Sequence, residues 1–364
     1  MIRPLLHLLA LCCVLLPAAV QSKPPAEAQK ASLKKESPDS PLRMQLARVQ
    51  ILLDRAGFRP GKIDGLVGEF TQKVADRYCA ANGLPQGSLL DVSGIPNPYR
   101  QYTVVEEDKK WIGPQASGPA AQEKLKAMLY ADLWELVAER FHCDLEFLHE
   151  LNKDIPEEKI AVGSVLRVPD VPEFQLTDVV ALEKKRRDEE AAKKAAASAT
   201  PSASLAPAQA AAPEPTAPPT PAPAAPPAPV RHLILLRRER LIEVWEGDRI
   251  VACFPCTPGS TKTPVPLGKW HIIGNILLPT FRWDKSVLDS GVRSSTAFEL
   301  PPGPNNPVGI VWMGLNRPSV GMHGTPNPDQ IGRNESHGCI RLANWDAFLL
   351  TQLVKKGTEV EVKD

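Results

Sequence analysis

The chain has 364 residues, with 43 Lys and Arg against 42 Asp and Glu, so its formal net charge is +1. This length allows two or three domains, and the near-neutral charge gives no reason to expect a nucleic acid partner. Proline accounts for 38 residues, twice the usual share of about 5%, and 11 of these lie between residues 201 and 230. The composition therefore excludes a single compact body and predicts compact units joined by a proline-rich linker.

Residues 1–22 have the pattern of a secretory signal peptide. Arg3 supplies the positive charge, Leu5 to Leu16 form the apolar core, and small residues follow from Ala18 to Ser22. An uncleaved membrane anchor is the alternative interpretation, although the apolar run is short for a bilayer span. We therefore expect a secreted protein of the periplasm or cell wall.

Five cysteines remain after the two in the signal peptide are removed. An odd number in an oxidising compartment leaves at least one thiol unpaired, and that thiol needs a role. Cys253 and Cys256 form a C-x-x-C motif in a strand-like segment, so we interpret both as small buried apolar residues. Whether Cys79 and Cys143 form a disulfide is left open.

Residues 42–84 predict a small helical domain. Apolar residues from Leu42 to Leu53 recur on one helical face, Gly57 ends that helix, and a second apolar stripe follows Thr71. The segment LARVQILLDRAGFRPGKIDGLVGEFTQKVADRY resembles the three-helix peptidoglycan-binding domain of cell-wall enzymes. The resemblance implies glycan binding, and a domain that only packs against its neighbours is the alternative.

Residues 97–171 predict a second unit with the order strand, helix, helix, strand. The strands are YTVV and VGSVLRVP, and the helices contain LWELVAERF and LHELN. Together they resemble a LysM domain, a small α+β glycan-binding fold, into which an insert follows the first strand. Sugar binding is implied by the resemblance, and a purely structural role is again the alternative.

Residues 178–229 predict a linker. Its first part is charged and rich in alanine, which is typical of a solvated helix or a disordered run. Its second part is rich in alanine and proline and has almost no large apolar residues, so it favours extended polyproline II. Such a linker would let a catalytic domain search a wide substrate while the N-terminal units stay on glycan.

Residues 230–364 predict a mostly β domain. The segments HLILL, LIEVW, RIVACF and TEVEV are strand-like, and one helix is expected from Trp345 to Val354. Overall, we expect a multidomain protein with a mostly β domain, a small all-α domain and an α+β domain.

A cysteine and two histidines lie close together in this last domain, in the segments His323-Gly324-Thr325 and Ser336-His337-Gly338-Cys339-Ile340-Arg341. A cysteine nucleophile works as a thiolate. A nearby imidazole can hold it ionised and then protonate the leaving group. Glycine beside the cysteine lets the backbone approach a carbonyl, and its N–H groups can stabilise an oxyanion.

The full motif MHGTPNPDQIGRNESHGCIRLANWD resembles the active-site signature of the L,D-transpeptidase catalytic domain, the YkuD family. That resemblance implies that Cys339 is the nucleophile and His323 the general base and acid, oriented by a backbone carbonyl. It further implies that His337 and Gly338 shape the site and the oxyanion hole.

Three residues of the same motif are candidates for substrate contact: Arg341, Met322 and Ser336. Arg341 either steadies the loop or binds a substrate carboxylate. A Cys/His zinc site is the alternative for the whole motif, but a fourth ligand is missing from the neighbourhood.

The resemblance implies a peptidoglycan L,D-transpeptidase that forms 3→3 crosslinks through a cysteine acyl-enzyme and releases D-Ala. No metal or cofactor is expected, and the expected partners are stem peptides and glycan strands. The same chemistry fits an L,D-carboxypeptidase, or attachment or release of a wall-linked protein. A non-catalytic wall-binding scaffold is a further alternative. The acceptor, the third stem residue, the envelope type and the oligomeric state are left open.

Overall fold

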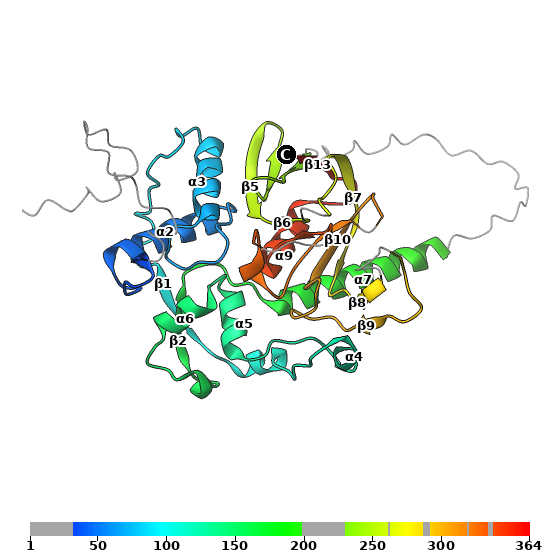
Figure 1. Cartoon of the computed structure of the whole chain (residues 1–364), viewed down its shortest axis with the longest axis horizontal. Helices are drawn as coiled ribbons and strands as arrows, with labels where there is room; N and C mark the ends of the chain where they lie inside the picture. The colour runs from blue at the N-terminus through cyan, green and yellow to red at the C-terminus, as the bar shows by residue number, and fades with distance from the viewer. Residues whose placement is uncertain (1–31, 199–229, 261–262, 287–291, 319, 334–337) are drawn as a thin grey trace, which may run out of the picture.

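The computed structural model describes residues 32–198, 230–260, 263–286, 292–318, 320–333 and 338–364 (Figure 1). The predicted signal peptide and the proline-rich part of the predicted linker lie outside these residues. Of the helices in the described part, none is long and apolar enough to cross a membrane.

The N-terminal unit is built on two helices, α2 (Pro41–Arg55) and α3 (Glu69–Ala81). Helix α2 begins where its sequence predicts, because the Ser40 side chain accepts a hydrogen bond from the backbone N–H of Arg43 and Pro41 occupies the first turn. Both predicted apolar stripes are therefore helical. Ala47 and Ile51 of α2 and Val74 of α3 are fully buried.

The second unit has the predicted order of strand, helix, helix and strand. Its elements are β1 (Tyr99–Thr103), α5 (Leu133–Arg140), α6 (Leu145–Leu151) and β2 (Val165–Pro169). The two strands pair antiparallel, and Asp132 and Asp144 cap the two helices. The insert, residues 106–130, carries η2 (Glu106–Trp111) and α4 (Pro119–Gln122). A further turn, η3 (Glu157–Lys159), precedes β2.

The charged segment after this unit is the long helix α7 (Leu176–Ser198). The sequence predicts either a solvated helix or a disordered run here, and the structure shows the helix. The first turns of α7 are anchored, since Leu176 and Val179 are buried and Arg186 donates a 2.7 Å hydrogen bond to Asn275. Only the later part of this segment is solvated as expected.

The C-terminal domain is a curved nine-stranded sheet, which confirms the mostly β prediction. Its order is β5-β4-β3-β13-β7-β10-β11-β12-β6. The strands are β3 (Arg231–Leu236), β4 (Leu241–Glu246), β5 (Arg249–Pro255), β6 (Thr257–Pro258), β7 (Gly268–Leu277), β10 (Val311–Leu315), β11 (Gly321–His323), β12 (Ile340–Arg341) and β13 (Glu359–Lys363). Because β5 and β6 are separated by one residue yet stand at opposite ends of this order, the sheet bends round on itself.

Helix α9 (Asn344–Leu353) fills the bend of the sheet, and it lies where a helix is predicted. Its Trp345, Ala347 and Leu350 are buried in the core. A separate hairpin of β8 (Phe281–Trp283) and β9 (Phe298–Leu300) lies outside the main sheet, and the turn η4 (Pro328–Gln330) precedes the cysteine segment.

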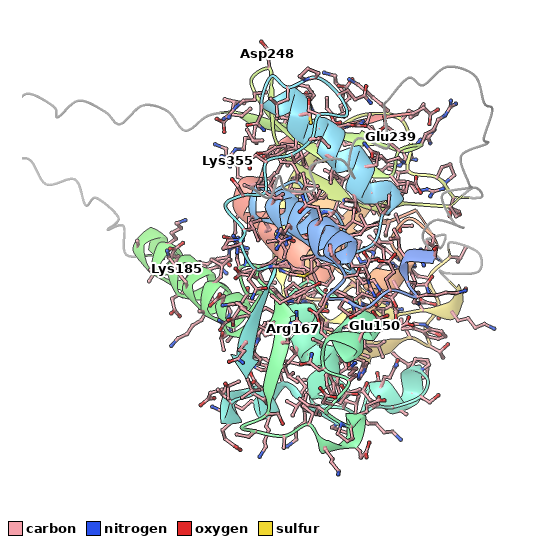
Figure 2. All side chains as sticks on the ribbon, turned by 90° about the vertical axis from the view of Figure 1, so that its left-hand side faces the viewer. Glu150, Arg167, Lys185, Glu239, Asp248 and Lys355 are labelled. Carbon is pink, nitrogen blue, oxygen red and sulfur yellow. The ribbon has the colours of Figure 1, made fainter. Side chains whose placement is uncertain are left out.

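The N-terminal units are docked on the C-terminal domain, with α2 and α3 lying over it (Figures 1 and 2). Arg59 and Cys253 are joined by a backbone hydrogen bond of 2.8 Å, and Cys253 donates in turn to Gly57 at 3.0 Å. One hydrophobic cluster runs through the second unit and the C-terminal domain. The expectation that the catalytic domain searches independently of these units is therefore wrong in this structure.

Candidate active site

The sheet topology brings the cysteine and histidine motifs together. Strands β11 and β12 are parallel neighbours, with His323 opposite Arg341 and Met322 opposite Ile340. Cys339 immediately precedes β12, so the thiol and the imidazole belong to adjacent strands. Gly338 has φ +92°, a conformation that favours glycine, and it makes the turn that leads into Cys339.

Cys339 differs from the other cysteines in exposure. Among the five that the structure describes, Cys79, Cys143, Cys253 and Cys256 are buried thiols, whereas Cys339 is half-buried. Burial raises the pKa of the Cys339 thiol above its usual value, and a backbone hydrogen bond with Gly321 and the charge of Arg341 oppose that rise. The prediction that Cys253 and Cys256 are buried small residues is confirmed, and Cys79 and Cys143 are not bridged.

His323 is buried and held in one orientation. Its Nδ1 lies 2.6 Å from the Gly324 carbonyl oxygen, so Nδ1–H donates to that oxygen and the lone pair is left on Nε2. The ring stacks on Trp312 with centroids 5.6 Å apart. Burial, aided by the charge of Arg341, lowers the pKa of His323 to about 4 against the pull of the Gly324 carbonyl.

These pKa directions make both groups neutral at neutral pH. These directions run against the expectation that the imidazole holds the thiol ionised, because burial disfavours both charged forms. A neutral imidazole with its lone pair on Nε2 is a competent general base once a substrate carbonyl is in place. The Gly324 carbonyl supplies the orientation that a carboxylate gives in other triads.

The remaining candidate site residues differ in burial and position. Arg341 is half-buried and lines a cavity beside the two strands, together with Thr325 and Asn327. Met322 is fully buried in the core, so its side chain has no surface to offer a substrate and the prediction for it is wrong. Ser336 and His337 lie outside the described residues.

Asn344 is a supporting residue that the sequence analysis does not identify. Its Oδ1 accepts a hydrogen bond from Ile310 N at 3.2 Å, and its Nδ2 donates to Glu139 at 3.0 Å. A Cβ on Gly324 would lie 2.2 Å from that Oδ1, so Asn344 packs against the peptide that orients His323. The sequence shows a polar residue at the start of a helix, but its partner Glu139 is 205 positions away.

Within the described part of the chain, no three His, Cys, Asp or Glu side chains gather as metal ligands would. The arrangement at β11 and β12 brings a thiol near an imidazole that a backbone carbonyl orients.

Comparisons with known proteins concern the domain that contains this site. Residues 230–362 match the family model of the L,D-transpeptidase catalytic domain, YkuD. A putative L,D-transpeptidase YkuD of Bacillus licheniformis is 30% identical over 123 residues, which are 34% of this chain and 59% of that protein. The probable L,D-transpeptidase YbiS of Escherichia coli is 40% identical over 65 residues, 18% of this chain and 21% of that protein.

Solved structures of L,D-transpeptidases also resemble part of this chain. An L,D-transpeptidase from Mycobacterium smegmatis matches 37% of this chain and 59% of its own, with a TM-score of 0.31 and 18% identity. The chain thus spans less than two thirds of the length of these relatives, and the likeness concerns the C-terminal domain.

Proposed function

We propose that the chain is a peptidoglycan L,D-transpeptidase that forms 3→3 crosslinks, because residues 230–362 match the family model of the L,D-transpeptidase catalytic domain, YkuD. The observation that carries this proposal is the pairing of β11 and β12. It puts the half-buried Cys339 at the start of the strand that neighbours His323, a buried histidine whose Nδ1–H donates to the Gly324 carbonyl.

In the first half-reaction, Cys339 attacks the carbonyl carbon between the third stem residue and the terminal D-Ala. His323 Nε2 takes the thiol proton as the C–S bond forms, and it gives a proton to the departing D-Ala amine as the C–N bond breaks. The backbone N–H groups of Gly338 and Cys339, with His337 shaping the loop, stabilise the oxyanion. A thioester remains on the enzyme.

In the second half-reaction, the side-chain amine of a neighbouring stem attacks the thioester. His323 accepts a proton from that amine and returns one to the Cys339 sulfur. Two half-reactions through one covalent intermediate give ping-pong kinetics. Neither half-reaction needs a metal or an organic cofactor.

The acceptor decides between related activities. If water attacks the thioester, the enzyme is an L,D-carboxypeptidase. If a protein amine attacks, or a protein is the group released, it attaches or releases a wall-linked protein. Acceptor choice depends on groove shape and water exclusion. The reaction products therefore distinguish these alternatives, whereas the Cys339 and His323 pair is common to all of them.

We assign the N-terminal units, residues 42–84 and 97–171, to glycan binding, and the protein to the periplasm or cell wall after removal of residues 1–22. Binding to purified sacculi tests the first assignment. A Cys339→Ala protein that sediments with sacculi supports glycan binding, and one that stays in the supernatant contradicts it.

Product analysis tests the proposed activity. The mature protein and its Cys339→Ala variant are incubated with a disaccharide-tetrapeptide, and products are weighed by mass spectrometry. We expect a crosslinked dimer lacking one D-Ala, formed only by the protein with Cys339. A tripeptide product alone identifies a carboxypeptidase, and products formed equally by the variant contradict cysteine catalysis.

A further inference from the structure

A cavity of about 490 Å³ lies beside the catalytic strands, and two units of the chain line it. On one side are Arg341, two residues after Cys339, and Thr325, two residues after His323. On the other side are Ala116, Gln122 and Leu125 of the insert. The insert thus lies against the catalytic domain, where it faces the neighbourhood of the nucleophile.

The insert is fixed in this position by backbone hydrogen bonds to the C-terminal domain. Met128 N donates to Pro302 O at 2.9 Å, and Asn305 N donates to Met128 O at 3.0 Å. Gly303 has φ +148°, and a Cβ there would lie 2.1 Å from Met128 O. This close approach requires glycine, so the wall is built into the fold before any ligand binds.

The lining chemistry matches a peptide better than an apolar ligand. Side-chain amides of Gln122 and Asn327 supply both donors and acceptors, as peptide groups require, whereas the Gln115 amide already donates to the Gly113 and Leu129 carbonyls. Arg341 adds a guanidinium for a carboxylate. Glu135 adds a carboxyl group for an ammonium group, although burial raises its pKa and its Oε2 already accepts a hydrogen bond from Ala131 N. A stem peptide offers the same set: peptide groups, carboxylates and the free amine of a diamino acid.

We propose that the insert of the second unit, residues 106–130, is the second wall of the substrate site and binds the stem peptide beside Cys339. This inference rests on the proposed function, because it names the part of the chain that recognises that substrate. It also gives the insert a role other than glycan binding.

Met128 both docks the insert and lines the cavity, but the other docking residues of the insert are separate from those that face the cavity. Docking uses the backbone of Met128 and Leu129 and the Glu123 carboxylate, which accepts a 2.9 Å hydrogen bond from Glu299 N. Ala116 and Gln122 face the cavity. Substitutions at these two positions therefore change the wall while the docking contacts stay in place.

The test uses Ala116→Trp, which fills the cavity, and Gln122→Ala, which removes one amide and carries little risk of misfolding. Ala120→Trp is the matched control, because Ala120 is an exposed residue of the same insert that does not line the cavity. Binding of a disaccharide-tetrapeptide is measured by calorimetry in the Cys339→Ala background, so that no turnover is required. Thermal unfolding of each variant confirms the fold.

We expect Ala116→Trp to weaken binding at least about tenfold, Gln122→Ala to weaken it severalfold, and Ala120→Trp to leave it unchanged. Equal affinities in all four proteins, or no binding of the peptide to the unsubstituted background, overturn the inference. A third outcome separates the two proposals. If the wall variants lose binding and the protein with Cys339 forms no product, the result supports the wall and overturns the proposed activity.

Single-turnover measurements in the protein with Cys339 then identify which stem the wall holds. Slower thioester formation in Ala116→Trp assigns it to the donor stem. Normal thioester formation with loss of crosslinked dimer assigns it to the acceptor stem. Wild-type rates in both steps contradict the inference.

Discussion

Burial disfavours the charged forms of both Cys339 and His323, raising the pKa of the thiol and lowering that of the imidazole. We therefore expect both groups to be uncharged at neutral pH. A resting thiolate–imidazolium pair would react with a small alkylating agent at neutral pH. A neutral thiol reacts only as it deprotonates.

We therefore expect the rate of alkylation of Cys339 by iodoacetamide to rise steadily with pH toward and beyond the ordinary thiol pKa of 9.0. Intact-mass spectrometry follows the reaction, and the Cys339→Ala protein reports labelling of the four buried cysteines. A pH-independent plateau of reactivity through the neutral range would show that an ion pair exists and that the site is not neutral.

Glu139 is a second buried titratable residue, and it connects the second unit to the active site. Tyr130 Oη and Asn344 Nδ2 donate to its carboxylate at 2.8 and 3.0 Å. Burial nevertheless raises the pKa of Glu139 to about 8 from the ordinary 4.5. Between these two values the native state keeps a proton that the unfolded state has released, so the contribution of Glu139 to stability falls as pH rises.

We expect Glu139→Gln to remove this pH dependence, since the amide oxygen can accept the same two hydrogen bonds and does not titrate. Urea unfolding at the two ends of this pH window gives the free energy of unfolding of both proteins. Relative to the variant, the wild type should be less stable at the upper end than at the lower end. If the free energies of unfolding of the wild type and the variant differ by the same amount at both pH values, the raised pKa of Glu139 is contradicted.

At the scale of elements, a buried ionic cluster joins α2, the loop after it and α9. Arg59 lies 2.9 Å from Asp54 and 2.8 Å from Asp346, and all three side chains are at most 6% exposed. His142 of the second unit lies 2.9 Å from the Arg59 guanidinium. Removing the cation leaves two carboxylates buried without it, and such a loss is strongly destabilising.

We expect Arg59→Met, which keeps most of the volume, to lower the free energy of unfolding by about 3–5 kcal/mol. Arg55→Ala is the matched control, because Arg55 pairs with Asp170 at 2.6 Å but both side chains are more than a third exposed. That pair should contribute about 0–1 kcal/mol. Equal effects of the two substitutions in chemical denaturation would show that the cluster does not hold the elements together.

Local patterns predict most elements of this fold. The stripes of α2, α3, α5 and α6 and the apolar strands β3, β4, β5 and β13 are periodic within one segment, so the sequence alone indicates them. The resemblance of the SHGC motif likewise directs attention to His323, which lies on β11, and to Cys339, which immediately precedes the neighbouring strand β12.

Docking is not predictable in the same way, because it depends on pairs far apart in the chain. Arg59 and Asp346 are 287 positions apart, and each by itself resembles an ordinary surface charge. The insert has no periodic pattern that points to the catalytic domain. Its position follows only from contacts such as Met128 with Pro302.

At the scale of the whole molecule, the N-terminal units and the catalytic domain behave as one body in this structure. The backbone pairing of Arg59 with Cys253, the ion pair of Arg77 with Glu243 and the packing of Phe174 on Phe348 join them at separate places. The domain that holds the active site is therefore in direct contact with the units to which we assign glycan binding.

We expect the two halves to stay together when the chain between them is cut. A specific protease site placed within residues 199–229 allows this cut in the folded protein. After cleavage, the fragments should elute together in gel filtration and separate only in denaturant. Separation under native conditions would show that the halves are independent and that the linker alone joins them.

The central claim is that Cys339 carries an acyl group from a stem tetrapeptide. The most direct test is to mix the mature protein with a tetrapeptide, quench in acid within one turnover and locate the adduct by peptide mass spectrometry. The account predicts one tripeptide acyl group as a thioester on Cys339, one D-Ala released per enzyme, and loss of both in His323→Ala. An adduct on another residue, or D-Ala release without a covalent intermediate, would contradict it.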